Sequence, residues 1–218
     1  MPFKMQKYIS EFIGTFILLV SIVGSGIAGQ QYTNDQMVIL VSHAVVIGLT
    51  LIFIIGIFAN FSGAHFNPIV SILFFIQKEL SKKDLFIFIS IQFTAAILGT
   101  IFANYIFGLS IVEISSNIRS GTNIYISEIF ASFGLLMVIL LSKVGGKNIV
   151  AFNVGIYITA AIIFTSSASF ANPAVSIARI FTESFAGINP STVIFFIGSQ
   201  VIGMFGAYFL YNRLFKTK

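Results

Sequence analysis

The sequence predicts an all-α membrane protein, with six transmembrane helices and two re-entrant half-helices arranged as an inverted repeat. Three observations predict it: an apolar composition, six long apolar segments, and one polar motif that occurs twice. Hydrophobic residues make up 57% of the 218 residues and charged residues only 9%, whereas a soluble domain carries roughly 25% charged residues. The mean hydropathy is +1.00. A water-soluble fold of this length cannot bury so much apolar surface, so we expect an integral membrane protein.

Six apolar segments are long enough to cross a bilayer, which takes about 20 residues in a helix. They cover residues 8–29, 36–59, 85–108, 124–142, 149–168 and 191–211. Two shorter apolar pieces, 67–77 and 172–182, remain. Each has only about 11 residues and cannot span, so each is interpreted as a re-entrant half-helix.

The distribution of basic residues predicts the orientation of this topology. With the N-terminus in the cytoplasm, the external segments hold only Arg119 and Arg179 of the 12 lysines and arginines. The others fall in cytoplasmic segments: Lys4, Lys7, Lys78, Lys82, Lys83, Lys143, Lys147, Arg213, Lys216 and Lys218. This bias follows the positive-inside rule. We therefore expect a multi-pass protein of the cell (inner) membrane with both termini cytoplasmic.

The two halves of the chain resemble each other. "YISEFIGTFILLV" (8–20) matches "YISEIFASFGLLM" (125–137), and "SIQFTAAILGT" (90–100) matches "GSQVIGMFGAY" (198–208). Each half, about 1–108 and 124–218, holds three spans and one half-helix, with 109–123 as the linker. Because three is odd, the second half is inserted upside down, and the functional site of such a repeat is expected near the midplane. We expect one membrane channel domain over residues 1–218.

The phrase Asn-Pro-x-Val-Ser-Ile occurs at 67–72 and again at 172–177. Asparagine is a favoured helix N-cap and proline is favoured at the first helical position, so Asn67-Pro68 and Asn172-Pro173 each predict a helix start. A single such pair indicates only a turn. Two copies in corresponding places bring two positive helix ends together near the membrane centre, where they oppose cations and protons. The free amide hydrogens of each asparagine are then available to an oxygen-bearing solute.

These motifs, with "SGAHFNP" and the paired "SE(F/I)" phrases, resemble the aquaporin and aquaglyceroporin (major intrinsic protein) family over essentially the whole chain. The resemblance implies a passive channel, a homotetramer in the lipid bilayer, and one pore per subunit. It implies pore motifs at Asn67-Pro68-Ile69 and Asn172-Pro173-Ala174. It also implies that Glu11 and Glu128 are structural, accepting hydrogen bonds from the re-entrant loops, and that His65 belongs to a pore loop.

The outer constriction departs from the family pattern. Most members carry an arginine three residues after the second asparagine, where this chain has Val175. The other positions of this selectivity filter correspond to Ile47, Ser169, and either Ala160 or Ile162, depending on where the count begins. This ring has no charge and no aromatic side chain, which is similar to bacterial aquaglyceroporins associated with arsenic resistance. We expect it to be wider and less polar than a water-selective filter.

Two further residues bear on the pore. The first arginine after the motif is Arg179, one helical turn beyond Val175. It is expected either to extend to the outer surface or to line the outer vestibule, with Glu183 in position to neutralise it. Ile69 stands where the family has alanine, and the sequence leaves open whether its bulkier side chain narrows the pore centre.

The leading hypothesis is a channel for glycerol-like polyols, undissociated arsenous acid and water that excludes ions. A mainly water-selective aquaporin is the alternative, and an ion-coupled secondary transporter is a third, disfavoured because few ionisable residues lie within the spans. The sequence predicts no enzyme, no catalytic residues, no metal, no cofactor and no nucleic-acid partner. With no cysteine, it has neither disulfides nor thiol chemistry.

Overall fold

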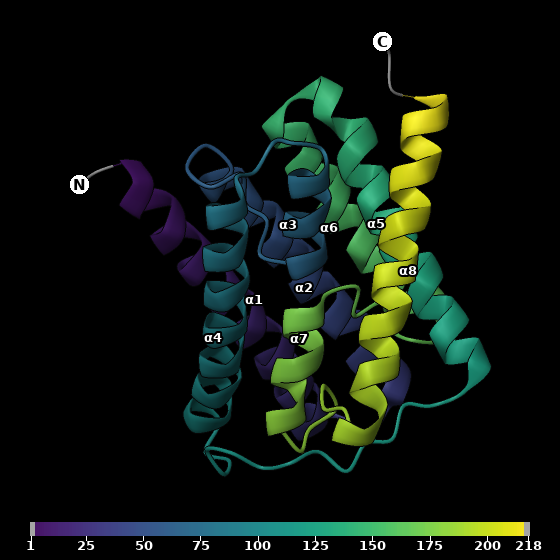
Figure 1. Ribbon diagram of the computed structural model, residues 1–218. Helices are drawn as coiled ribbons and strands as arrows, with labels where there is room; N and C mark the ends of the chain where they lie inside the picture. Colours follow the sequence, from purple (N-terminus) through teal and green to yellow (C-terminus); the bar gives the residue numbers. More distant parts are fainter. Residues whose placement is uncertain (1–2, 216–218) are drawn as a thin grey trace.

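The computed structural model describes residues 3–215 and is entirely helical in its regular structure (Figure 1). Its long helices are α1 (Phe3–Tyr32), α2 (Gln36–Phe58), α4 (Lys82–Ile106), α5 (Thr122–Ser142), α6 (Lys147–Phe164) and α8 (Pro190–Leu214). Its short helices are α3 (Pro68–Ile76), α7 (Pro173–Ala178) and the 3-10 helices η1 (Lys143–Gly145) and η2 (Arg179–Phe181). The six long helices are long and apolar enough to cross a membrane. The predicted fold class is confirmed.

Polar caps set helix ends that apolar segments alone do not reveal. Asp35 caps α2 by accepting hydrogen bonds from the backbone N–H groups of Met37 and Val38, and Ser81 caps α4 in the same way through Asp84 N–H. α4 therefore begins three residues before its apolar segment. α6 ends at Phe164, four residues earlier than predicted, because Thr165 is already extended. The following residues form the approach to α7.

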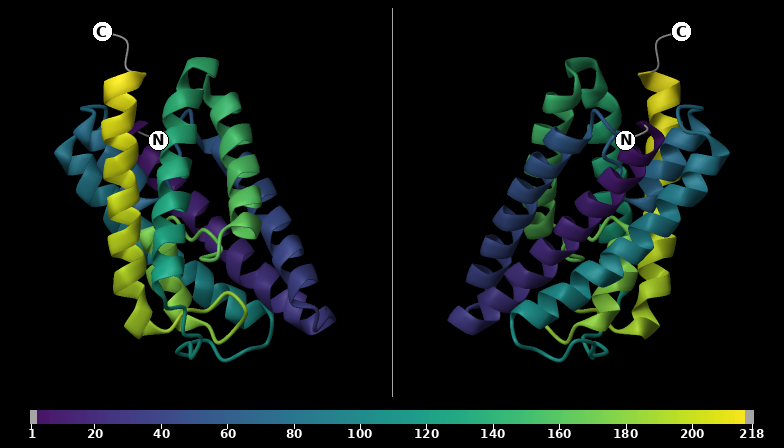
Figure 2. Two further views of the ribbon diagram at one scale, coloured as in Figure 1. Left: turned by 90° about the vertical axis from the view of Figure 1, so that its right-hand side faces the viewer. Right: turned by 90° about the vertical axis from the view of Figure 1, so that its left-hand side faces the viewer.

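The long helices pack as two related triplets. α1 packs along α2 and α4, α5 packs along α6 and α8, and α2 and α6 join the triplets. Figure 2 shows the long helices crossing obliquely in one bundle. Close contact depends on small residues: a Cβ at Gly99 would lie 2.6 Å from the Phe16 carbonyl oxygen of α1, and one at Gly203 would lie 2.5 Å from that of Ile129 in α5. A larger side chain at either glycine would force these helices apart.

The two half-helices enter from opposite ends of the bundle. We call the end at which α1 begins and α8 ends the terminal face, and the opposite end the distal face (Figure 1). α3 lies toward the terminal face and α7 toward the distal face, and both pack against α4 and α8. Their first residues approach each other in the middle of the molecule, since α3 and α7 also contact each other.

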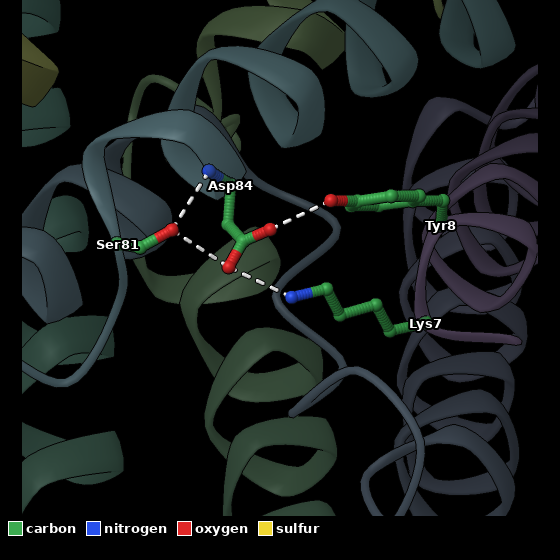
Figure 3. Close-up of polar contacts among 4 residues, drawn as sticks. All are labelled: Lys7, Tyr8, Ser81 and Asp84. Atoms are coloured by element: carbon green, nitrogen blue, oxygen red, sulfur yellow. Dashed lines mark hydrogen bonds and ion pairs between the residues drawn. The ribbon is translucent and has the colours of Figure 1, made fainter. Parts of the chain in front are cut away.

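A polar cluster ties the start of α1 to the start of α4 at the terminal face (Figure 3). Asp84 accepts hydrogen bonds from Tyr8 Oη at 2.7 Å and Ser81 Oγ at 2.8 Å. Lys7 Nζ lies 2.7 Å from the same carboxylate. At the distal face, the linker between α4 and α5 bonds to the loop after η2: Ser115 N–H donates to Ile180 O and Asn189 N–H to Asn117 O, each at 2.8 Å.

Candidate functional site

A cavity of about 470 Å³ passes between the half-helices and the long helices. Glu79, Lys143 and Lys147 line its terminal end, and His43 and Arg179 line its distal end. The two motif asparagines border its middle section. The cavity therefore extends from the terminal end of the bundle past the junction of the half-helices to the level of His43 and Arg179.

Each motif asparagine makes hydrogen bonds through both its side-chain oxygen and its side-chain nitrogen. Asn67 Oδ1 accepts from Ile69 N–H at 3.1 Å, and Asn172 Oδ1 accepts from Ala174 N–H at 3.0 Å, so each caps its own half-helix. The amide nitrogens cross over: Asn67 Nδ2 donates to Ala171 O at 2.8 Å, and Asn172 Nδ2 donates to Phe66 O at 2.9 Å. The expectation of free amides is corrected in part. One N–H of each amide locks the opposite loop, and only the second is available to the cavity.

The approaches to the two asparagines share an unusual backbone. Positive φ angles occur at Gly63, Ala64 and Phe66 before the first asparagine, and at Ala168, Ser169 and Ala171 before the second. These are the same three positions relative to each asparagine. Non-glycine residues in this conformation cost of order 1 kcal/mol each, so both loops need firm anchoring. Both loops border the cavity along these residues.

Two fully buried glutamates supply that anchoring. Glu11 on α1 accepts hydrogen bonds from His65 N–H at 2.9 Å and Phe66 N–H at 2.8 Å. Glu128 on α5 accepts from Phe170 N–H at 3.2 Å and Ala171 N–H at 2.6 Å. Neither glutamate lines the cavity. Their contacts are those of structural residues that hold the strained loops.

A glutamine and a serine complete each anchor. Gln92 on α4 donates to Glu11 and to Ser71 of α3, and Gln200 on α8 donates to Glu128 and to Ser176 of α7. The paired glutamine phrases of the sequence thus correspond to equivalent hydrogen-bond networks. Each network joins one long helix from the start of a half, one from its end, and the half-helix between them.

The predicted ring of the outer constriction lines the cavity with one exception. Ile47, Ile162, Ser169 and Val175 all border it and are buried in the protein. Ala160 does not border it and lies on the exposed surface of α6. Counting residues back from Asn172 therefore selects the wrong residue, Ala160, because the turn after α6 shortens the approach to the asparagine. Ile162 is the residue that faces the cavity.

The structure shows no narrowing of the cavity by Ile69. Ile69 is fully buried and does not line the cavity. It is the second residue of α3, and its side chain packs into the apolar core with Leu73. The same holds for Pro68, Pro173 and Ala174, which form the first turns of the half-helices but do not border the cavity. The motif's asparagines, but not the residues after them, therefore face the pore.

Arg179 borders the cavity and is only 3% exposed, which excludes extension to the outer surface. Its Nε donates to Ala186 O, and its guanidinium carbon lies 3.5 Å from the centre of the Phe170 ring. The predicted pairing with Glu183 is wrong. The chain leaves the helical path at Thr182, which is extended. Ser116 donates to Glu183 from both Oγ and N–H, and these bonds hold the pKa of Glu183 below its ordinary value.

His43 and Lys143 are polar lining residues that were not predicted as site residues. His43 lies one turn before Ile47 on α2 and borders the distal end of the cavity. Its spacing from Ile47 is the signal that assigns it to the same helix face. Lys143 borders the terminal end, where its Nζ lies 2.6 Å from Glu79 and 4.7 Å from the centre of the Phe74 ring. No sequence pattern pairs these three residues, which come from separate elements.

The terminal end contains the predicted pore-loop histidine. His65 borders the cavity, and its Nδ1 lies 3.0 Å from Ser71 Oγ. Its ring centre is 4.7 Å from that of Phe74 and 5.3 Å from that of Phe88. Within residues 3–215 no group of three His, Asp or Glu residues could hold a metal ion. The geometry of this site is that of a conduit with fixed polar groups at a few positions along an otherwise apolar wall.

Comparisons with known proteins agree with this geometry. The family model described as major intrinsic protein matches residues 1–166. The aquaglyceroporin AqpS of Rhizobium meliloti is 38% identical over 198 residues, covering 91% of this chain and 85% of that protein. Aquaporin NIP1-1 of Arabidopsis thaliana is 30% identical over 147 residues, covering 63% of this chain and 49% of that protein.

A solved structure shows the same fold. The aquaglyceroporin from Plasmodium falciparum superposes with a TM-score of 0.74 over 96% of each chain, at 22% identity. The fold, the paired asparagine caps in the middle of a long cavity, and the family model over most of the sequence converge on one conclusion. The chain belongs to the major intrinsic protein family, whose members are channels and not enzymes.

Proposed function

We propose that this protein is an aquaglyceroporin-type channel that passes small uncharged solutes and water down their gradients and excludes ions and protons. The solutes include glycerol-like polyols and undissociated arsenous acid. One observation carries the choice of solute: the ring of Ile47, Ile162, Ser169 and Val175 bears no charge and no aromatic side chain. Such a ring offers apolar contact to the carbon backbone of a polyol. It lacks the fixed charge and the aromatic side chain that set the width of a water-selective filter.

Ion exclusion rests on the two half-helices. Their N-terminal ends meet at Asn67 and Asn172, and each helix end carries partial positive charge from its unpaired N–H groups. A cation at this point meets two positive ends, with only neutral asparagine amides beside it. An ion of either sign also loses hydration against the apolar wall, and that cost is far larger than for a neutral solute. Neutral solutes therefore pass at the lowest barrier.

The membrane setting follows from the lysines and the exposed apolar surface. Large apolar side chains such as Leu49, Phe53 and Phe130 are more than half exposed on the spans, as lipid contact requires. The positive-inside rule assigns the terminal face to the cytoplasm and the distal face to the outside of the cell membrane. The family resemblance favours a homotetramer with one pore in each subunit.

The test is stopped-flow permeability of the purified protein in liposomes for water, glycerol and arsenous acid. We expect all three to exceed protein-free liposomes, without saturation at low concentration and without response to an imposed ion or proton gradient. Water flux without glycerol flux would favour a water-selective pore. Flux that follows an ion gradient would indicate a coupled transporter.

A further inference from the structure

We propose that His43 and Arg179 form a hydroxyl-recognition site at the distal mouth, one helical turn outside the uncharged ring. The inference rests on the proposed function and deepens it, because it names the chemistry of the solutes that the channel favours. His43 is one turn from Ile47 on α2, and Arg179 is one turn from Val175 beyond α7. Both residues are displaced from the ring in the same direction, toward the distal face.

One loop holds the two residues at the same level of the cavity. The Phe185 ring contacts the imidazole of His43 edge to face, with ring centres 5.6 Å apart. The next residue, Ala186, accepts the hydrogen bond from Arg179 Nε through its carbonyl oxygen. Phe185 N–H is itself fixed by Gln30 Oε1 at 2.7 Å. His43 and Arg179 are thus positioned from α2 and η2 by adjacent residues of one anchored loop.

The hydrogen bonds of Ser25 determine which nitrogen of His43 is free. Ser25 Oγ lies 2.6 Å from Ser21 O and 3.2 Å from Ile22 O, so its single hydrogen is donated to the backbone. Ser25 Oγ must therefore accept at its 2.8 Å contact with His43 Nδ1. With the hydrogen on Nδ1, the Nε2 atom of the neutral ring is an acceptor. Within residues 3–215, Nε2 makes no hydrogen bond to the protein.

Arg179 supplies the complementary donor. Its Nε is occupied by Ala186 and its plane rests on Phe170, but its Nη atoms make no hydrogen bond to any residue from 3 to 215. No carboxylate in this part of the chain lies within ion-pair distance of it: the ion pairs found there are Lys7–Asp84 and Lys143–Glu79. A buried guanidinium without a protein acceptor favours an oxygen-bearing ligand.

An acceptor nitrogen and a cationic donor at one level match a hydroxyl group, which donates one hydrogen and accepts another. Uncharged polyols and undissociated oxyacids carry such groups. An anion satisfies Arg179 but presents lone pairs to His43 Nε2, and a cation is repelled by Arg179. The site therefore lowers the barrier for hydroxylated neutral solutes by replacing hydrogen bonds to water that they lose at the mouth.

The test is the glycerol-to-water permeability ratio in liposomes at matched protein density. Arg179→Met keeps chain length without a donor, and His43→Leu keeps volume without an acceptor. We expect the ratio to fall about tenfold for Arg179→Met and about three- to tenfold for His43→Leu. Because both residues bind one hydroxyl group, the double variant should lose no more than the larger single loss. His43→Gln, whose amide oxygen can replace Nε2, should recover most of the ratio.

Glu113→Gln is the control. Glu113 is an exposed residue of the distal linker; its side chain makes no hydrogen bond to residues 3–215 and it does not line the cavity. Its replacement also changes the charge of the distal face by one unit and should change the ratio by less than about twofold. An unchanged or higher ratio in Arg179→Met and His43→Leu, losses that multiply in the double variant, or a Glu113→Gln loss equal to that of Arg179→Met would overturn the proposal. A wild type that conducts water but no glycerol would instead refute the proposed function.

Discussion

The two mouths of the cavity use equivalent positions of the repeat with different residues. Phe74 and Arg179 each lie seven residues after a motif asparagine, and His65 and Phe170 each lie two before. In both mouths these two side chains contact each other: the His65 and Phe74 ring centres are 4.7 Å apart, and the Arg179 guanidinium carbon is 3.5 Å from the Phe170 ring centre. The scaffold is symmetric, but the chemistry it presents to the cavity is not.

The cation of each mouth is balanced differently. At the terminal mouth Lys143 sits over Phe74 and is neutralised by Glu79 at 2.6 Å. At the distal mouth Arg179 has a carbonyl and an aromatic ring as partners, with no carboxylate of residues 3–215 at ion-pair distance. Discrimination between solutes is therefore expected at the distal mouth, where a buried fixed charge has no carboxylate partner among residues 3–215. At the terminal mouth the second lysine, Lys147, is exposed and donates to Asn60 Oδ1 at 3.0 Å.

The largest effect should come from the buried glutamate anchors that both halves share. Glu128→Ala removes the acceptor of Phe170 N–H and Ala171 N–H and of the Gln200 amide. Leaving buried donors unpaired costs about 1–3 kcal/mol per group, so the yield of folded protein should fall sharply. Glu11→Ala should do the same. The measurement is the monodisperse fraction and the thermal unfolding midpoint in detergent.

Conservative replacements test whether the anchors act as acceptors. Glu11→Gln and Glu128→Gln keep one acceptor oxygen, so each should retain more folded protein than its alanine counterpart. If Glu128→Ala folds normally and only its solute preference changes, the anchoring role of Glu128 is refuted. A loss in one half alone would show that the two networks are equal in geometry but not in energy.

Asn172→Asp should abolish most conduction with a smaller effect on folding. The aspartate keeps an oxygen to cap α7 but cannot donate to Phe66 O as Asn172 Nδ2 does at 2.9 Å. When ionised, it also offsets the positive ends of the half-helices. Glycerol flux should fall at least about tenfold, or cation leakage should appear, in liposome assays. Asn67→Asp, which loses the equivalent bond to Ala171 O, should match it, and wild-type flux in both variants would contradict the pairing.

Val175→Arg should narrow the uncharged ring. Val175 borders the cavity and is buried, and a guanidinium adds bulk and donors in a fixed fork. Glycerol permeability should fall about three- to tenfold while water permeability is largely retained, because water passes a narrower ring. Val175→Leu, which adds bulk without charge, is the control and should have a smaller effect. An unchanged glycerol-to-water ratio would place the constriction elsewhere along the cavity.

The fold could be predicted from the sequence because its signals are local and are repeated along the chain. Six apolar segments and two Asn-Pro caps are local signals, and the doubled motif defined the inverted relation between the halves. The structure kept the number and order of these elements. Most of their ends moved, by up to five residues at the start of α1. The start of α4 depends on the Ser81 cap and the end of α6 on the extended Thr165, which hydropathy does not reveal, whereas α2 begins after its Asp35 cap where predicted.

The site was less predictable where the chain departs from regular helix. Helix periodicity predicts that Ile47 and Val175 face the cavity, but whether Ile162 or Ala160 does so depends on the turn after Phe164. The environment of Arg179 depends on the end of the helix at Thr182, which separates it from Glu183. Contacts such as Arg179 to Ala186 O or Glu183 to Ser116 cannot be predicted from sequence spacing, because they depend on the conformation of the loops.

The smallest expected effect is a pH-dependent change in stability that comes from the contact between Glu183 and Ser116 in the distal loops. The bonds from Ser116 lower the pKa of Glu183 in the folded state, so the contact contributes its full stability above the ordinary glutamate pKa of about 4.3. That contribution is lost as the pH falls through the lowered pKa and the folded protein takes up the proton. Because Glu183 is exposed, the contribution should be below about 1 kcal/mol.

Glu183→Gln should therefore lower the unfolding midpoint slightly at pH 7, and the difference from wild type should vanish at an acidic pH below the lowered pKa of Glu183. Glu113 is the control: it is an exposed glutamate of the linker that contains Ser116, and its side chain makes no hydrogen bond to residues 3–215. Glu113→Gln should not change the midpoint at either pH. Glycerol and water flux at pH 7 should be the same in both variants, because neither residue borders the cavity. A solute preference altered by Glu183→Gln would mean that Glu183 acts on Arg179 across the loop and neutralises it, as Glu79 neutralises Lys143 at the terminal mouth.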